Sequence, residues 1–229
     1  MKTLIVGMGE VGIALAEVLK QYNPICYDIK ESRVDVWATP EIMHITFPYS
    51  DNFVQQVKEY QEKYEPKYTV VHSTVPVGTC SQITAIDSPI RGLHPNLESG
   101  IKTFVKFLGG PQASGVADYF RRAGLRVCLF DKAEITEAMK LFDTEYYRVC
   151  IEFALRVKTY CDANNLNFHE VYTLANQSYN EGYSALGHPE FVRPVLQPII
   201  RPVGEKQIGG HCVLNNKELI KLSEKSIQE

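Results

Sequence analysis

In the first 130 residues, short apolar runs alternate with stretches whose apolar residues recur every three to four positions. The short runs predict buried strands, and the longer period predicts amphipathic helices. The expected strands are Thr3–Val6, Ile25–Tyr27, Met43–Phe47, Thr69–His72, Ile90–Leu93, Phe104–Leu108 and Val127–Phe130. The expected helices are Val11–Tyr22, Asn52–Tyr64 and Val116–Ala123. Strands that alternate with helices are typical of a parallel sheet with helices on both faces.

The pattern changes near Asp131. From Lys132 to about Asn165 there is neither glycine nor proline, and apolar residues recur at helical spacing, which predicts one long helix. A shorter helix at about Phe168–Gln177, an irregular segment with several prolines and a last helix at about Lys217–Ser226 follow. We therefore expect an α/β fold in two domains: a Rossmann-like doubly wound parallel sheet in residues 1–131, and a helical domain built on the long helix in residues 132–229.

Composition narrows the functional classes. The chain has 229 residues, a net charge of −3 and no run rich in lysine or arginine, so a nucleic-acid partner is not expected. No apolar stretch approaches the ~20 residues of a membrane span. The six cysteines are scattered without a C-x-x-C pair, which argues against a metal site. No signal peptide is evident at the amino terminus, so we expect a cytoplasmic protein with reduced thiols that acts on a small molecule.

A glycine motif follows the first expected strand. Gly7, Gly9 and Gly12 form G-x-G-x-x-G at the start of a helix. The first glycine suits a tight turn, the second lets the backbone approach a pyrophosphate, and the third allows close helix–sheet packing. Free N–H groups at the helix start, around Glu10 and Val11, would face the phosphates. The motif predicts a dinucleotide site, and the alternative is a glycine-rich turn without a ligand.

An acidic residue ends the second expected strand. Asp28 lies 16 residues after Gly12, where a carboxylate would accept the ribose hydroxyls and repel a 2′-phosphate. The cofactor is therefore predicted to be NAD. Further cofactor-binding candidates follow the third and fourth expected strands, namely Pro48, Ser73 and Thr74.

Three further segments resemble the signatures of one enzyme family. His72–Thr79 reads H-S-T-V-P-V-G-T, Glu137–Tyr146 reads E-A-M-K-L-F-D-T-E-Y, and Ile208–Val213 reads I-G-G-H-C-V. In order and rough spacing they resemble the S-T-V-P-V-G-T, E-L-x-K-L-x-x-N-x-Y and G-G-H/S-C segments of the UDP-glucose and GDP-mannose 6-dehydrogenases. The resemblance covers nearly the whole chain and implies oxidation of a primary alcohol to a carboxylate with two NAD.

The resemblance also assigns roles. Cys212 matches the family's nucleophile, Lys140 the lysine that stabilises the oxyanion, and Thr74 the threonine that holds a catalytic water. Thr144 and Asn216 stand at the family's asparagine and aspartate positions. From the residues alone, Cys212 could equally be a small structural residue, Lys140 a solvated surface lysine, and Thr74 part of a proline-containing turn.

Substrate contacts are expected in three segments. Gly92–Gly100 loosely resembles the family's acidic S-P-E-x-L-x-x-G segment; it suggests Glu98 as an acid–base group, with His94 and Asn96 beside the substrate. Arg193 and Arg201 precede the cysteine loop, where cations could hold a phosphate or carboxylate, or simply be solvated. The loop glycines Gly209 and Gly210 complete the predicted substrate contacts.

The departures from the family pattern keep alternatives open. Threonine replaces asparagine at position 144 and asparagine replaces aspartate at 216, and the chain resembles a truncated form without the family's carboxyl-terminal nucleotide-binding domain. We expect an NAD-dependent oxidoreductase for a small polar alcohol, such as a sugar, sugar acid or nucleotide sugar, acting through a Cys212 thiohemiacetal. A two-electron hydroxyacid-type dehydrogenase that uses Lys140, or a non-catalytic NAD-binding accessory protein, are the alternatives. The resemblance also implies a homodimer through the long helix.

Overall fold

The computed structural model describes residues 1–29, 39–92, 96–195, 216 and 218–223. They contain a seven-stranded sheet in the order β2-β1-β3-β4-β5-β6-β7, in which β5 and β6 run antiparallel and the other neighbours run parallel. The strands are β1 Thr3–Val6, β2 Ile25–Tyr27, β3 Ile42–Ile45, β4 Tyr68–Val71, β5 Ile86–Asp87, β6 Lys106–Gly109 and β7 Val127–Phe130. The expected Rossmann-like α/β fold is confirmed.

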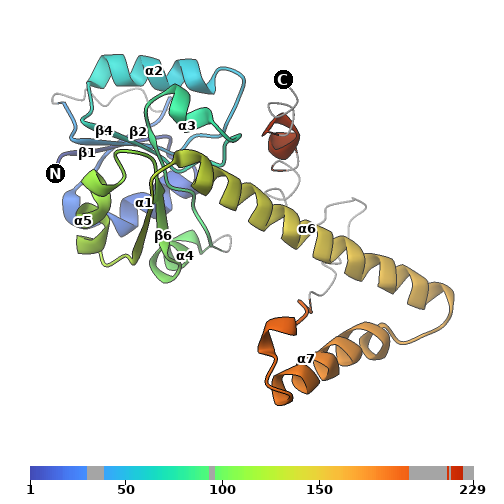
Figure 1. Ribbon diagram of the computed structural model, residues 1–229. Helices are drawn as coiled ribbons and strands as arrows, with labels where there is room; N and C mark the ends of the chain where they lie inside the picture. Colours follow the sequence, from blue (N-terminus) through green and yellow to red (C-terminus); the bar gives the residue numbers. More distant parts are fainter. Residues whose placement is uncertain (30–38, 93–95, 196–215, 217, 224–229) are drawn as a thin grey trace. The chain divides into compact units, whose positions relative to one another are not determined.

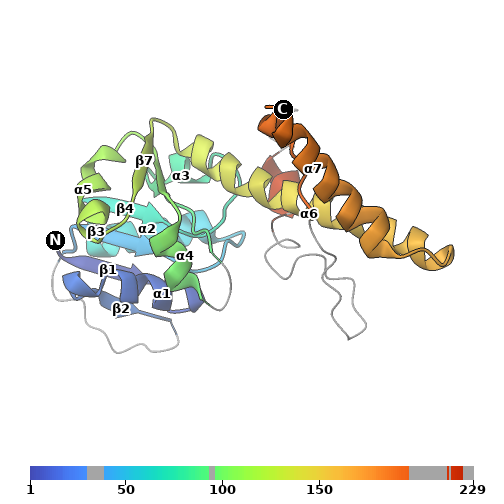
Figure 2. The ribbon, with the colours of Figure 1, turned by 90° about the horizontal axis from the view of Figure 1, so that it is seen from below.

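Helices cover both faces of this sheet (Figure 1). Helices α2 and α3 lie on one face, and α1, α4 and α5 lie on the other. In Figure 2 the molecule is seen from the side of α1, α4 and α5. Each face has its own apolar core, one centred on Leu15 and Phe120 and the other on Phe53 and Val57. The helices are α1 Glu10–Val18, α2 Phe53–Tyr64, α3 Thr79–Gln82, α4 Leu97–Thr103, α5 Ser114–Arg122, α6 Ala133–Ala163 and α7 Ala175–Ala185, with short turns at Lys20–Tyr22, His169–Leu174 and Pro189–Phe191.

One expected strand is wrong. Residues 90–92 of the predicted Ile90–Leu93 are not a strand, and the strand is instead Ile86–Asp87. Pro89 follows it and has no N–H to donate to a neighbouring strand, so pairing stops before Ile90. The side chain of Ile90 is still buried in the core, and this burial produces the apolar run that resembled a strand.

The chain forms two compact units. Of the described residues, those within Met1–Leu141 and within Leu222–Glu229 form one unit, and those within Phe142–Lys221 form the other. The 31-residue helix α6 passes from the first unit into the second. Within the second unit, the chain turns back after α6, and α7 diverges from α6 at an angle (Figure 1). The ring of Tyr172 contacts the rings of Phe153 and Phe168. No helix in the described part of the chain is both long enough and apolar enough to span a bilayer.

Candidate functional site

The three glycines of the turn after β1 differ in how closely other atoms approach them. Gly7 has a φ of +100°, and its N–H donates to the carbonyl of Tyr27 at 2.8 Å. A Cβ at Gly12 would lie 1.9 Å from the carbonyl oxygen of Gly7. By contrast, a Cβ at Gly9 would meet no atom of the described residues within 4 Å. Gly7 and Gly12 are therefore required by the protein's own packing, whereas the bare backbone at Gly9 leaves room for a ligand.

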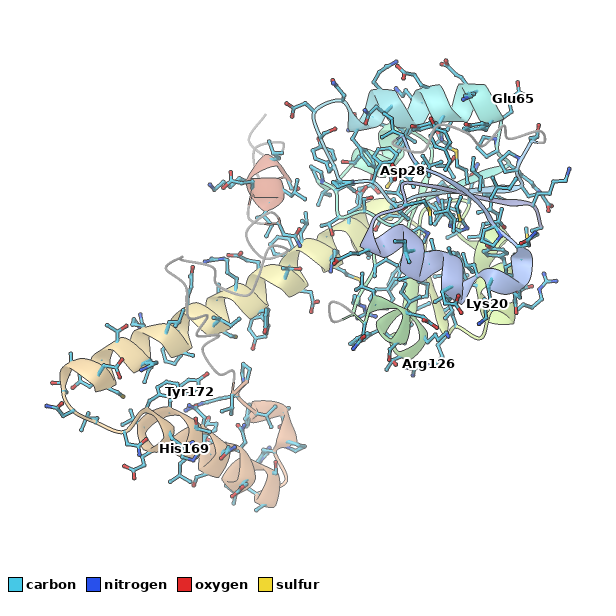
Figure 3. The ribbon with its side chains drawn as sticks, turned by 180° about the vertical axis from the view of Figure 1, so that it is seen from behind. Lys20, Asp28, Glu65, Arg126, His169 and Tyr172 are labelled. Carbon is cyan, nitrogen blue, oxygen red and sulfur yellow. The ribbon has the colours of Figure 1, made fainter. Side chains whose placement is uncertain are left out.

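Asp28 is held against this turn. Its Oδ2 accepts the N–H of Met8 at 2.8 Å. Figure 3 shows Asp28 near the start of α1, while Lys20 lies beyond the other end of that helix. The first helical residues, Glu10 and Val11, directly follow Gly9, so the positive end of the helix dipole and the carboxylate lie at the same turn. This arrangement suits a pyrophosphate beside a ribose diol.

The loops after β3 and β4 are tied to the same edge of the sheet. Thr46 Oγ1 donates to the carbonyl of Gly7 at 2.5 Å, and Ser73 Oγ donates to the carbonyl of Phe47 at 2.5 Å. Pro48, which follows Phe47, is exposed, and Thr74, which follows Ser73, is half-buried. The predicted cofactor residues therefore meet at the carboxyl ends of β1, β2, β3 and β4, the edge at which open α/β sheets bind ligands.

Two of the predicted catalytic residues meet in the second unit. Asn216 is buried, and its Nδ2 donates to Thr144 Oγ1 at 3.1 Å across 72 residues of sequence. Lys140 lies one helical turn before Thr144 in α6 and is half-buried. Cys212 precedes Asn216 by four residues but lies outside the described residues, as do His94, Arg201, Gly209 and Gly210.

Other predicted substrate residues have partners elsewhere. Glu98 pairs with Lys102 within α4, Oε1 to Nζ 2.5 Å. Asn96 is exposed and stands at the start of α4, which packs against α1. Arg193 belongs to the second unit, where its guanidinium stacks over the ring of Tyr179 at 3.3 Å from the centroid. The roles of these three side chains in substrate binding stay predictions.

A chain of buried polar side chains was not foreseen from the sequence. Lys106 Nζ lies 3.1 Å from His72 Nδ1, and His72 Nε2 lies 2.9 Å from His44 Nδ1. His44 Nε2 lies 3.3 Å from the Tyr119 hydroxyl, which is 3.1 Å from Thr3 Oγ1. The chain thus links strands from β6 to β1 through the interior of the first unit.

Burial determines the charge of this chain. Desolvation, with a smaller effect of the Lys106 charge, lowers the pKa of His44 to about 3. Desolvation also lowers the pKa of Lys106 to about 7. His44 is therefore neutral at physiological pH, so that one ring nitrogen donates and the other accepts. The sequence signal that could have indicated this buried polar chain was a histidine within each of two expected apolar strands.

Comparison with known proteins identifies solved structures that share the fold of this chain. No family model matches the sequence, and no curated protein matches it. Among solved structures, the UDP-D-ManNAc dehydrogenase of Pyrococcus horikoshii superposes over 96% of this chain and 63% of its own, with a TM-score of 0.67 and 17% identity. The chain has the fold of a nucleotide-sugar dehydrogenase. This confirms, for the fold, the resemblance predicted from the three motifs.

Two other nucleotide-sugar dehydrogenases superpose on this chain with similar TM-scores. The UDP-N-acetyl-mannosamine dehydrogenase of Staphylococcus aureus superposes over 99% of this chain and 69% of its own, with a TM-score of 0.67 and 14% identity. The GDP-mannose dehydrogenase of Pseudomonas aeruginosa covers 77% of this chain and 57% of its own, with a TM-score of 0.62 and 15% identity. This chain therefore spans about two thirds of the length of the nucleotide-sugar dehydrogenases that it superposes on.

Proposed function

We propose that this protein is an NAD-dependent oxidoreductase that acts on a CH–OH group of a small polar alcohol: a sugar, sugar acid or nucleotide sugar. The observation that carries the proposal is the glycine turn, where the backbone at Gly9 is open and the carboxylate of Asp28 is held at Met8. Both features suit a dinucleotide with unmodified ribose hydroxyls.

The chain's own residues would divide the chemistry as follows. NAD supplies the hydride acceptor when bound. The Lys140 ammonium would stabilise the alkoxide and later oxyanions. In the thiol route, the Cys212 thiolate attacks the aldehyde carbon and forms a C–S bond, and oxidation of this thiohemiacetal gives a thioester. Water, held by Thr74, then displaces the thiol and leaves a carboxylate.

The test is cofactor binding followed by the yield of NADH. We expect calorimetry to show binding of NAD in preference to NADP, because Asp28 would repel a 2′-phosphate. The protein is then incubated with NAD and a panel of sugars, sugar acids, sugar phosphates and nucleotide sugars, and NADH is counted against product. Two NADH per product support the thiol route, and one supports a two-electron dehydrogenase. NAD binding without turnover of any compound supports the accessory role, and absence of NAD binding overturns the proposal.

We further propose that the second unit pairs with another copy of the chain. Along α6, exposed large apolar residues recur at alternating spacings of four and three, at Phe142, Tyr146, Val149 and Phe153, and again at Tyr160. This is the a/d pattern of a helix seam, and it extends over roughly 27 Å at 1.5 Å per residue. A stripe of this regularity suits a self-complementary partner, as in two-fold dimers.

The oligomeric state of two variants tests this pairing. We expect light scattering to give twice 25.9 kDa for the wild-type chain. Val149→Glu places a charge in the middle of the stripe and should give a monomer, because a buried unpaired carboxylate costs several kcal/mol. Thr159→Glu adds the same charge to an exposed position of α6 outside the stripe and should leave the dimer intact. A wild-type monomer, or equal behaviour of the two variants, contradicts the pairing.

A further inference from the structure

We propose that Glu137 is a positioning residue that fixes the loop carrying Thr74 to the helix carrying Lys140. The inference rests on the proposed function, in which these two side chains act on one substrate. The sequence motif contains Glu137 but assigns it no role. Its contacts in the first unit supply one.

Glu137 binds the backbone of the loop with both carboxylate oxygens. Oε2 accepts the N–H of Gly78 at 2.6 Å, and Oε1 accepts the N–H of Cys80 at 2.8 Å. These N–H groups lie at the start of α3, where helical N–H groups have no partner within the helix. Gly78 has a φ of +88°, a conformation that glycine adopts without strain. The carboxylate therefore completes a backbone arrangement that the loop cannot satisfy alone.

The carboxylate is also buried. Only 1% of Glu137 is exposed. Desolvation raises its pKa, and the hydrogen bonds from the Cys80 and Gly78 N–H groups oppose that rise. Burying a carboxylate is costly unless hydrogen bonds compensate it, and hydrogen bonds to an ionised group are stronger than neutral ones. A contact that only anchored the loop at the surface would not need a buried carboxylate. The burial therefore favours a role in which Glu137 holds the loop in one fixed geometry.

The loop transmits this geometry to Thr74. Within it, Thr79 Oγ1 donates to the carbonyl of Pro76 at 2.7 Å, and Val75 is buried. At its beginning, Ser73 Oγ is bonded to the carbonyl of Phe47. The loop is thus internally braced between its two ends, and a displacement at Gly78 would reach Thr74.

On the helix side, Glu137 lies three residues before Lys140, which is nearly one turn of α6. Fixing Glu137 therefore fixes both the rotation and the axial position of the helix that carries Lys140. A catalytic group displaced by about 1 Å can lose about a hundredfold in rate, so this restraint matters for turnover.

A matched control lies one turn earlier in the same helix. Glu134 Oε1 accepts the hydroxyl of Ser81 at 2.6 Å, and this contact is at the surface. It joins the same two elements as Glu137 does, but through a side chain instead of the loop backbone. Glu134→Gln therefore changes the hydrogen bond to Ser81 without changing the contacts of Glu137 with Gly78 and Cys80.

The test compares Glu137→Gln with Glu134→Gln. The amide that replaces the Glu137 carboxylate can accept from one backbone N–H but presents its own donors to the other. We expect amide exchange at Gly78 and Cys80 to rise about tenfold or more, as for the loss of one hydrogen bond to a charged group. We expect kcat to fall about 10- to 100-fold, while the NAD dissociation constant, to which the glycine turn and Asp28 contribute most, changes less than about threefold. Glu134→Gln should leave all three values near those of the wild type.

Each outcome decides a separate claim. Faster amide exchange with unchanged kcat overturns the positioning role and leaves the proposed function standing. Unchanged exchange at Gly78 and Cys80 overturns the inference whether or not the enzyme turns over. A wild-type chain without turnover overturns the proposed function, and the exchange rates still decide whether Glu137 holds the loop. If Glu137→Gln does not fold, Glu137→Asp keeps the charge but shortens the reach, and the same three measurements apply.

Discussion

Gly12→Ala should abolish NAD binding and destabilise the first unit by about 1–2 kcal/mol. The new Cβ would lie 1.9 Å from the Gly7 carbonyl oxygen, a contact with backbone that no side-chain rotation can relieve. That oxygen also accepts the Thr46 hydroxyl, so the turn cannot move away without losing this bond. Overpacking of this kind costs about 1–3 kcal/mol or more, and the better helix propensity of alanine returns only about 1 kcal/mol. Urea unfolding and calorimetry measure the two effects.

Gly9→Ala is the matched control. A Cβ at this position meets no atom of the described residues within 4 Å, and the Gly9 φ of −75° suits any residue. The free energy of unfolding should therefore remain near the wild-type value. NAD affinity should nevertheless fall about tenfold or more, since the methyl group occupies the space where a pyrophosphate would approach the backbone. Wild-type affinity in Gly9→Ala would contradict NAD binding at this turn.

Lys140→Met should lower kcat by about 10²–10³, the usual cost of removing one group that stabilises a developing oxyanion. Methionine keeps the apolar length of the side chain and suits a helix, so stability should change little. Lys132→Met removes an exposed charge just before α6 and should retain full activity. Steady-state kinetics on the best compound of the panel measure both variants. Equal activity of the two variants would remove Lys140 from the catalytic machinery.

Cys212→Ser separates the two enzymatic hypotheses. In the thiol route, the variant should still release the first NADH but fail to form the thioester, so the yield falls from two NADH per product to one. In a two-electron dehydrogenase, the yield is one NADH for both proteins and the rate is unchanged. Rapid labelling of Cys212 by iodoacetamide at neutral pH, with protection by NAD, would further argue against the accessory role.

Local patterns predicted much of the first unit. The strands Thr3–Val6, Ile25–Tyr27 and Val127–Phe130 have the bounds expected from the sequence, because each is a short, mostly apolar run flanked by polar, glycine or proline residues. The short elements α3 and α4 were missed, since four and seven residues are too few to show a helical period. The strand Ile86–Asp87 was missed because Ile86 and Ile90 are both buried, and an apolar residue does not by itself show whether its backbone pairs with a neighbouring strand.

The polar interior was the least predictable part. His44, His72 and Lys106 lie within or beside short apolar runs, and nothing in those runs indicates that their side chains meet. Their contacts depend on the order of β3, β4 and β6 in the sheet. Strand order is a property of the packed chain, because each pairing must also bury helices on both faces.

By itself the sequence determined the glycine turn and its acidic partner, since backbone torsion and the absence of a Cβ are properties of single residues. It also determined the long helix, through the spacing of apolar residues over about 30 positions. Only the tertiary structure decided that Glu137 binds backbone 57 and 59 residues away, and that Asn216 meets Thr144 across 72 residues. Such contacts join segments that are distant in the chain, and which of them form depends on how the helices and loops pack rather than on any local pattern.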